Sequence, residues 1–310
     1  MTTPPPASAE TSPEAAEEEG ARRKPGLLQN LLPWVITVGC FGYLYSRIAS
    51  QAAREGKSAL GYLAEIFSSV EWGSWLLLMV PYSIFYFLID TGVLWRVVNW
   101  FNTKVDYLAL LPIRASTYII SILNEQVGKG AIALYLNRRY DVPAWQVGSS
   151  IFFIMFCEFF YLLLWALIGT LVSWDRVPAV FHWIPVIAGG GAIFFVVWIY
   201  LFRSARAEGF ALRERQGLLS FRQAPPSHYL TVVVMRSPAL LGAVWVYREA
   251  ASLFGVEIGL VEMLGVLPVI FFGTLIPGPF RAAAVTLWPT LFPDQAAQMT
   301  AFGFVQHNFF

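Results

Sequence analysis

The chain has 310 residues, of which 57% are hydrophobic and only 13% are charged. Soluble domains carry about 25% charged residues, so this composition excludes an ordinary soluble protein and predicts an integral membrane protein. The formal net charge is +1, and no basic patch with interleaved aromatic residues occurs, so we expect no nucleic-acid partner.

Residues 1–26 are rich in proline, alanine and glutamate, a composition that predicts a disordered tail. They lack a basic segment followed directly by an apolar core, so they do not form a signal peptide. Arg22, Arg23 and Lys24 precede the first apolar segment, and such clusters favour the cytoplasmic side of a membrane. We therefore expect a cytoplasmic N-terminal tail over residues 1–26 and a transmembrane domain over residues 27–310.

Five segments are long and apolar enough to cross a bilayer as helices, which requires about 20 residues. They are Leu31–Ile48, Trp72–Val97, Gln146–Ser173, Trp183–Phe202 and Tyr229–Tyr247. Between the first two, Ala49–Val70 alternates charged and apolar residues at helical spacing, which predicts an amphipathic helix on the membrane surface.

Ile113–Leu136 is apolar and of membrane length, but it contains several polar residues and two glycines. These are Arg114, Asn124, Glu125, Gln126, Lys129, Gly128 and Gly130. An ionisable group in hydrocarbon costs at least ~2.5 kcal/mol, so we expect this segment to face a polar site inside the bundle. Two interpretations remain open. Glu125 and Lys129 neutralise each other on a continuous helix, or the helix breaks near Gly128 and Gly130 and presents Lys129 to an anion.

The charges of the loops favour a re-entrant hairpin for Ile113–Leu136. Arg138 and Arg139 follow this segment, and five arginines lie in the Arg203–His228 loop, so both loops should be cytoplasmic. With a cytoplasmic N-terminus, two crossings return Asn99–Pro112 to the same side. The segment must then enter and leave the membrane on that side.

Ile258–Phe292 contains four prolines and cannot form one continuous helix. Two half-helices, Leu264–Ile276 and Ala282–Phe292, should meet at the break Pro277-Gly278-Pro279. The last segment, Gln295–Phe310, stays apolar to its end, which leads us to expect a truncated last helix.

Four further charges fall in apolar segments and are candidates for a buried site. Glu158 is either protonated or paired with a neighbouring helix, or it acts as a counter-ion to Lys129 or Arg236, or as a proton carrier. Arg236 either takes part in such a pair or extends to the cytoplasmic surface. Arg281 is a natural ligand for phosphate, or it anchors the chain at the bilayer surface. Asp90 is a weaker candidate for this buried site than the other three residues.

Enzyme motifs are largely missing. The chain contains no HExxH, GxSxG, P-loop, GxGxxG or CxxC motif, and we predict no cofactor and no metal site. His182, His228 and His307 are isolated in the sequence, so we expect structural roles for them.

The order of these motifs resembles the lysylphosphatidylglycerol synthase transmembrane-region family, also called flippase-like. The residues that carry the resemblance are Trp95-Arg96, Asn124–Lys129, Leu136–Arg139, the mid-membrane Glu158 and the break Leu275–Pro279. The expected proline of the first motif is absent around Gln126-Val127, and Lys129 stands where the family usually has an acidic residue. The resemblance implies an all-α, polytopic integral membrane helix bundle with two broken or re-entrant segments.

Members of that family move aminoacylated or other phospholipids, or polyprenyl-linked lipids, between leaflets. The soluble aminoacyl-transferase domain of some members is absent from this sequence. The resemblance thus implies a multi-pass protein of the cell inner membrane that binds or translocates an anionic phospholipid or polyprenyl-linked lipid, without the synthase activity. Its expected partners are such lipids and a soluble or membrane enzyme. The expected substrate-binding residues are Arg114, Asn124, Glu125, Lys129, Glu158, Arg236 and Arg281.

Two alternative functions, each of a different class, stay open. A membrane-embedded transferase would act on a lipid-linked substrate with Glu125 or Glu158 as the base, and an accessory subunit would have no site of its own.

Overall fold

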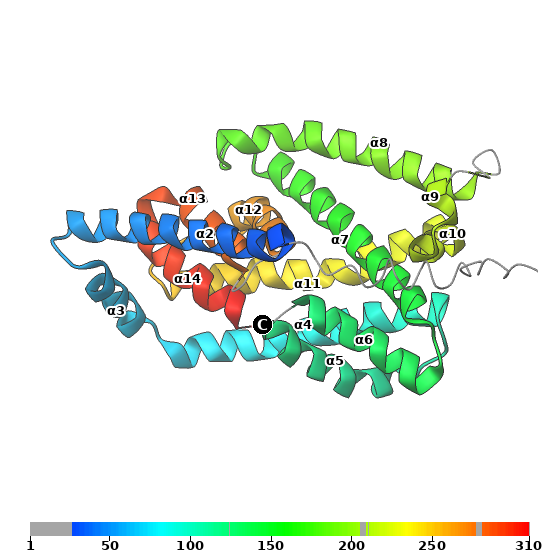
Figure 1. Ribbon diagram of the computed structural model, residues 1–310. Helices are drawn as coiled ribbons and strands as arrows, with labels where there is room; N and C mark the ends of the chain where they lie inside the picture. The colour runs from blue at the N-terminus through cyan, green and yellow to red at the C-terminus, as the bar shows by residue number, and fades with distance from the viewer. Residues whose placement is uncertain (1–26, 124, 205–208, 210, 277–280, 310) are drawn as a thin grey trace, which may run out of the picture.

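The protein is an all-α helix bundle (Figure 1). The computed structural model describes residues 27–123, 125–204, 209, 211–276 and 281–309; it leaves out the side chains of 27–30, 33, 120–123, 125–127, 129, 211 and 212. The predicted tail over residues 1–26 lies outside this description. No strand occurs among the residues described, which confirms the predicted fold class.

Four helical segments in the described part of the chain are long and apolar enough to cross a membrane: Trp72–Phe101, Ala144–Val172, Ala179–Arg203 and Pro226–Ser252. They contain α4 (Trp72–Phe101), α7 (Ala144–Val172), α8 (Ile184–Arg203) and α11 (Pro226–Ser252). Each coincides with a predicted span. The remaining predicted span lies within α2 (Leu27–Arg54). Short helices fill the connections: α9 (Ala211–Glu214), α10 (Leu219–Gln223), η1 (Ala179–Trp183), η3 (Gln216–Leu218) and η5 (Pro293–Gln295).

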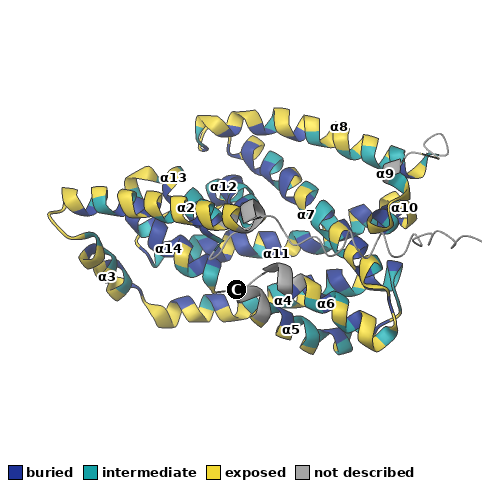
Figure 2. Ribbon diagram, in the orientation of Figure 1, coloured by how far each residue is buried: buried dark blue, intermediate teal, exposed yellow. Residues whose placement is uncertain are grey.

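Many residues of α2 and α8 are exposed (Figure 2), and large apolar side chains are among them, as expected of surfaces that contact lipid. On α8 they include Val186, Ile193, Phe194 and Val197. In water such a surface would be an interaction site or an aggregation liability, whereas hydrocarbon solvates it well. The surface therefore agrees with the composition in indicating a membrane protein. The orientation of the N-terminus stays a prediction.

The predicted surface helix is shorter than Ala49–Val70. Residues 49–54 continue α2, the chain turns at Gly56 with a φ of 68°, and α3 spans Ala59–Ser69. The Ser58 side chain accepts a hydrogen bond from the Gly61 amide and so caps α3. Across the turn, hydrogen bonds to Glu65 and Glu55 raise the pKa of Lys57.

The segment around Ile113–Leu136 forms the predicted hairpin, made of α5 (Tyr107–Leu123) and α6 (Glu125–Tyr140) packed side by side (Figure 1). Gln146 Nε2, at the start of α7, donates to the Phe101 carbonyl at the end of α4 over 2.7 Å. Both ends of the hairpin therefore lie at the same end of the bundle. Of the two interpretations of this segment, a break near Gly128 and Gly130 is wrong, because α6 runs through both glycines. Glycine costs a helix only about 1 kcal/mol, which tertiary packing readily offsets.

The second irregular segment forms the two predicted half-helices, α12 (Leu260–Thr274) and α13 (Ala282–Leu291). Pro277–Phe280 lie outside the described residues. A Cβ on Gly273 would lie 2.7 Å from Ala284 Cα, so the two helix backbones nearly touch. The last helix, α14 (Ala296–Asn308), packs on α13, where Gly303 leaves room for the Trp288 indole.

Small residues also permit the contact between α7 and α12. A Cβ on Gly169 would lie 2.3 Å from the Leu264 carbonyl oxygen, and one on Gly265 would lie 2.4 Å from Ser173 Oγ. Close backbone approach at glycine is typical of helix packing in membranes. Helix α11 contacts α4, α7 and α12, so these helices form the frame around the polar residues of the interior.

Candidate functional site

A cavity of about 200 Å³ opens between α4, α5, α7 and α11, and its lining extends to α6, α12, α14 and the N-cap residue of α13. Its charged lining residues in the described part of the chain are Asp90, Arg114, Glu158, Arg236 and Arg281, and His307 also lines it. Apolar side chains such as Ile151, Ile154 and Met155 form other parts of the wall. The cavity therefore combines charged and apolar surface inside the bundle.

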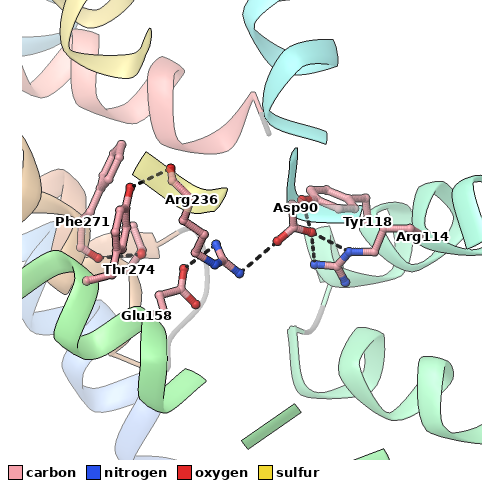
Figure 3. Close-up of polar contacts among 8 residues, drawn as sticks. Asp90, Arg114, Tyr118, Glu158, Arg236, Phe271 and Thr274 are labelled. Atoms are coloured by element: carbon pink, nitrogen blue, oxygen red, sulfur yellow. Dashed lines mark hydrogen bonds and ion pairs between the residues drawn. The ribbon is translucent and has the colours of Figure 1, made fainter. Parts of the chain in front are cut away.

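Asp90 is the centre of a network of ion pairs (Figure 3). Its Oδ2 accepts hydrogen bonds from Arg114 Nε over 2.7 Å and from Tyr118 Oη over 3.0 Å, and it lies 2.6 Å from Arg114 Nη2. Its Oδ1 accepts from Arg236 Nη2 over 3.2 Å. Through these contacts one carboxylate joins α4 to both α5 and α11. The Asp90 side chain is only 6% exposed, so the contacts are buried.

Arg236 also contacts a second carboxylate. Its Nη1 donates to Glu158 Oε1 over 3.2 Å, and its side chain is 8% exposed. The extension of Arg236 to the membrane surface is therefore wrong, because two acidic side chains hold the guanidinium inside. The ion pair fits two of the expectations for Glu158, pairing with a neighbouring helix and service as a counter-ion to Arg236. Glu158 is 25% exposed and remains accessible from the cavity.

Local sequence positions the two arginines. Arg114 and Tyr118 stand four residues apart on one face of α5, and the guanidinium lies 4.7 Å from the Tyr118 ring centroid. On α11, Ser237 follows Arg236 and accepts a hydrogen bond from Trp165 Nε1 over 3.0 Å. This contact with α7 fixes the turn that carries Arg236 beside Glu158.

Arg281 approaches the cavity from the N-terminus of α13. It is the N-cap residue, with a left-handed backbone at φ 49°. Its Nη1 donates to the carbonyl of His307 over 3.1 Å. Among the described residues, Arg281 makes no ion pair with a carboxylate, unlike Arg114 and Arg236. Three arginines and two carboxylates thus line the described part of the cavity, an excess of one positive charge.

The structure gathers four of the predicted site residues, Arg114, Glu158, Arg236 and Arg281, around one cavity. Asn124 lies outside the described residues, as do the side chains of Glu125 and Lys129, although both belong to α6.

Sequence reasoning underrated Asp90 and assigned His307 a structural role. A usable signal existed for Asp90. Three spans each carry a charge near their middle, at Asp90, Glu158 and Arg236, and such charges require partners inside a membrane. No comparable feature of the sequence indicated that His307 lines the cavity.

Among the described residues, no three His, Cys, Asp or Glu side chains come together as metal ligands would.

Comparison of the chain with protein-family models, with curated proteins and with solved structures found no match. The resemblance to the flippase-like family therefore stays a prediction. Fold and site together define an α-helical bundle of membrane-spanning composition with a charged internal cavity.

Proposed function

We propose that this protein binds the anionic headgroup of a membrane lipid in its internal cavity and moves that lipid between the two leaflets. The observation that carries the proposal is the excess positive charge of the described lining, which arises from Arg281. Charge is expensive inside a membrane unless it is compensated, so an unbalanced guanidinium favours an anionic ligand. Arginine suits a phosphate group in particular, because its fork of N–H groups matches the phosphate oxygens.

The mixed lining of the cavity supports a lipid over a free ion. Ile151, Ile154 and Met155 provide apolar surface beside the charged groups. A lipid is an amphiphile, so its charged headgroup can contact the charged lining residues and its apolar chain the apolar ones. The two broken segments, α5–α6 and α12–α13, suit this function as well, since helix ends in a membrane commonly surround a substrate site.

A second candidate function is a membrane-embedded transferase with Glu158 as the base. The exposure of Glu158 to the cavity favours it, because a general base must reach its substrate. The two functions differ in product. A translocase moves the lipid unchanged, whereas a transferase alters its mass.

The test uses the purified protein reconstituted into vesicles of phosphatidylcholine that contain fluorescent phosphatidylglycerol. We expect the protein to expose inner-leaflet fluorophore to a membrane-impermeant quencher, with no change in lipid mass by mass spectrometry. Arg281→Gln should reduce this rate, while Arg222→Gln, which alters an exposed arginine outside the cavity, should preserve it. A lipid of altered mass would favour the transferase. Absence of both movement and conversion would refute both functions.

A further inference from the structure

A hydrogen bond joins two buried rings, one of which belongs to a residue that lines the cavity. Trp288 Nε1, on α13, lies 2.9 Å from His307 Nε2, on α14. Trp288 is fully buried and His307 is 2% exposed. The carbonyl of the same His307 accepts the hydrogen bond from Arg281. The three residues therefore form one connected unit, and two of them, Arg281 and His307, line the cavity.

The contact with Trp288 defines which nitrogen of His307 carries the proton. An indole N–H is only a donor, so His307 Nε2 must accept with its lone pair. The imidazole is then neutral, and its proton lies on Nδ1. A doubly protonated ring would direct an N–H group at the indole N–H and would add a positive charge beside Arg281. Both effects favour the neutral form.

The Nδ1–H group of His307 has no hydrogen-bond partner among the residues that the structure describes. An N–H group without a protein partner is free to donate to a ligand or to water. His307 lines the cavity beside Arg281, whose guanidinium has five N–H donors and uses one of them on the His307 carbonyl. Two neighbouring residues with unlike N–H donors, one charged and one neutral, thus line the cavity.

We propose that Arg281 and His307 form a subsite for the phosphate group of the ligand, in which Arg281 supplies the charge and His307 a neutral N–H positioned by Trp288. This inference rests on the proposed function and specifies its ligand. A neutral imidazole leaves the excess charge of the described lining at one, which matches the single negative charge of a phosphodiester. The ligand class is therefore a phosphodiester headgroup.

Two substitutions of His307 separate the roles of its nitrogens. In His307→Asn the amide nitrogen can take the place of Nδ1, so the donor to phosphate is kept. In His307→Gln the amide reaches the place of Nε2, so the contact with Trp288 is kept and the donor is lost. We expect His307→Gln to weaken the binding of dioctanoyl phosphatidylglycerol to the detergent-purified full chain by about tenfold or more, as for a hydrogen bond to a charged group. His307→Asn should stay within about threefold of wild type.

The matched control is His228→Gln, since His228 stacks on Trp100 and does not line the cavity. Its affinity for the lipid should equal that of wild type. A second titration with inorganic phosphate identifies the source of the anion. If the variants rank in the same order with both probes, free phosphate also enters the subsite; if only the lipid binds, the headgroup supplies the phosphate. Either result supports the subsite.

Equal affinity of His307→Gln and wild type would overturn the subsite while leaving the proposed function in place. Failure of wild type to bind either probe would overturn both. The tautomer of His307 can be measured independently, from the chemical shifts of its two ring nitrogens in ¹⁵N-labelled protein. They should show a proton on Nδ1 and none on Nε2, and Trp288→Phe should abolish this preference. A wild-type ring protonated on Nε2 would contradict the proposal.

Discussion

Replacement of Asp90 by asparagine should destabilise the bundle more than any other single change of charge in the cavity. The substitution keeps the size of the side chain but removes the charge that Arg114 and Arg236 share. Arg236 retains Glu158, whereas Arg114 loses its only carboxylate in the described structure. Breaking a buried ion pair by removing one partner costs about 3–5 kcal/mol. Asp90→Asn should therefore lower the folded-to-unfolded ratio by roughly two to four powers of ten.

The measurement is the free energy of unfolding of the purified protein in mixed micelles, with increasing sodium dodecyl sulfate as denaturant. Lys57→Met is the control, because it removes only exposed ion pairs, those with Glu55 and Glu65, and its unfolding midpoint should match wild type. In the Asp90→Asn background, Arg114→Met should cost less than it does alone, since it removes the guanidinium left without a partner. A loss below about 1 kcal/mol for Asp90→Asn would refute the reasoning.

Three further predictions follow from the fold and the site. Single cysteines at Thr103 and Asn137, in a chain without its native cysteines, should react with an impermeant reagent from the same side of a vesicle; reaction from opposite sides would exclude the hairpin. Gly169→Ala should force α7 and α12 apart and lower the free energy of unfolding by about 1–3 kcal/mol, while Gly189→Ala, where nothing lies within 4 Å of the new Cβ, should be tolerated. Arg281→Lys keeps the charge but loses the fork, so lipid affinity should fall roughly ten- to a hundredfold at unchanged expression; an unchanged affinity would remove Arg281 from the site.

The helical elements could be predicted from the sequence because their signals are local. Apolar length identified the spans. Pro277 and Pro279 identified the boundary between α12 and α13, since proline lacks the N–H that a helix requires, although Pro268 and Pro289 lie inside these helices. Gly128 and Gly130 misled us about the first break. Their cost in a helix is small, and whether a helix continues through them depends on packing that the sequence does not display.

The site could be predicted only in part, because pairing between distant residues is a property of the folded bundle. The charges themselves were visible as exceptions in apolar segments. Asp90 and Arg236 are 146 positions apart, however, and nothing local indicates that they meet. The bond between Trp288 and His307 likewise joins two helices, and each ring alone is compatible with an ordinary apolar core.

The central position of Asp90 has a consequence for the order in which the membrane receives this chain. Synthesis proceeds from the N-terminus, so α4 is delivered before either arginine that pairs with its carboxylate. Arg114 follows after only 24 positions, whereas Arg236 comes much later. The hairpin of α5 and α6 therefore supplies the first countercharge while the rest of the bundle is still being made. In biogenesis, α4 and the hairpin form the smallest unit that can enter the bilayer with Asp90 compensated.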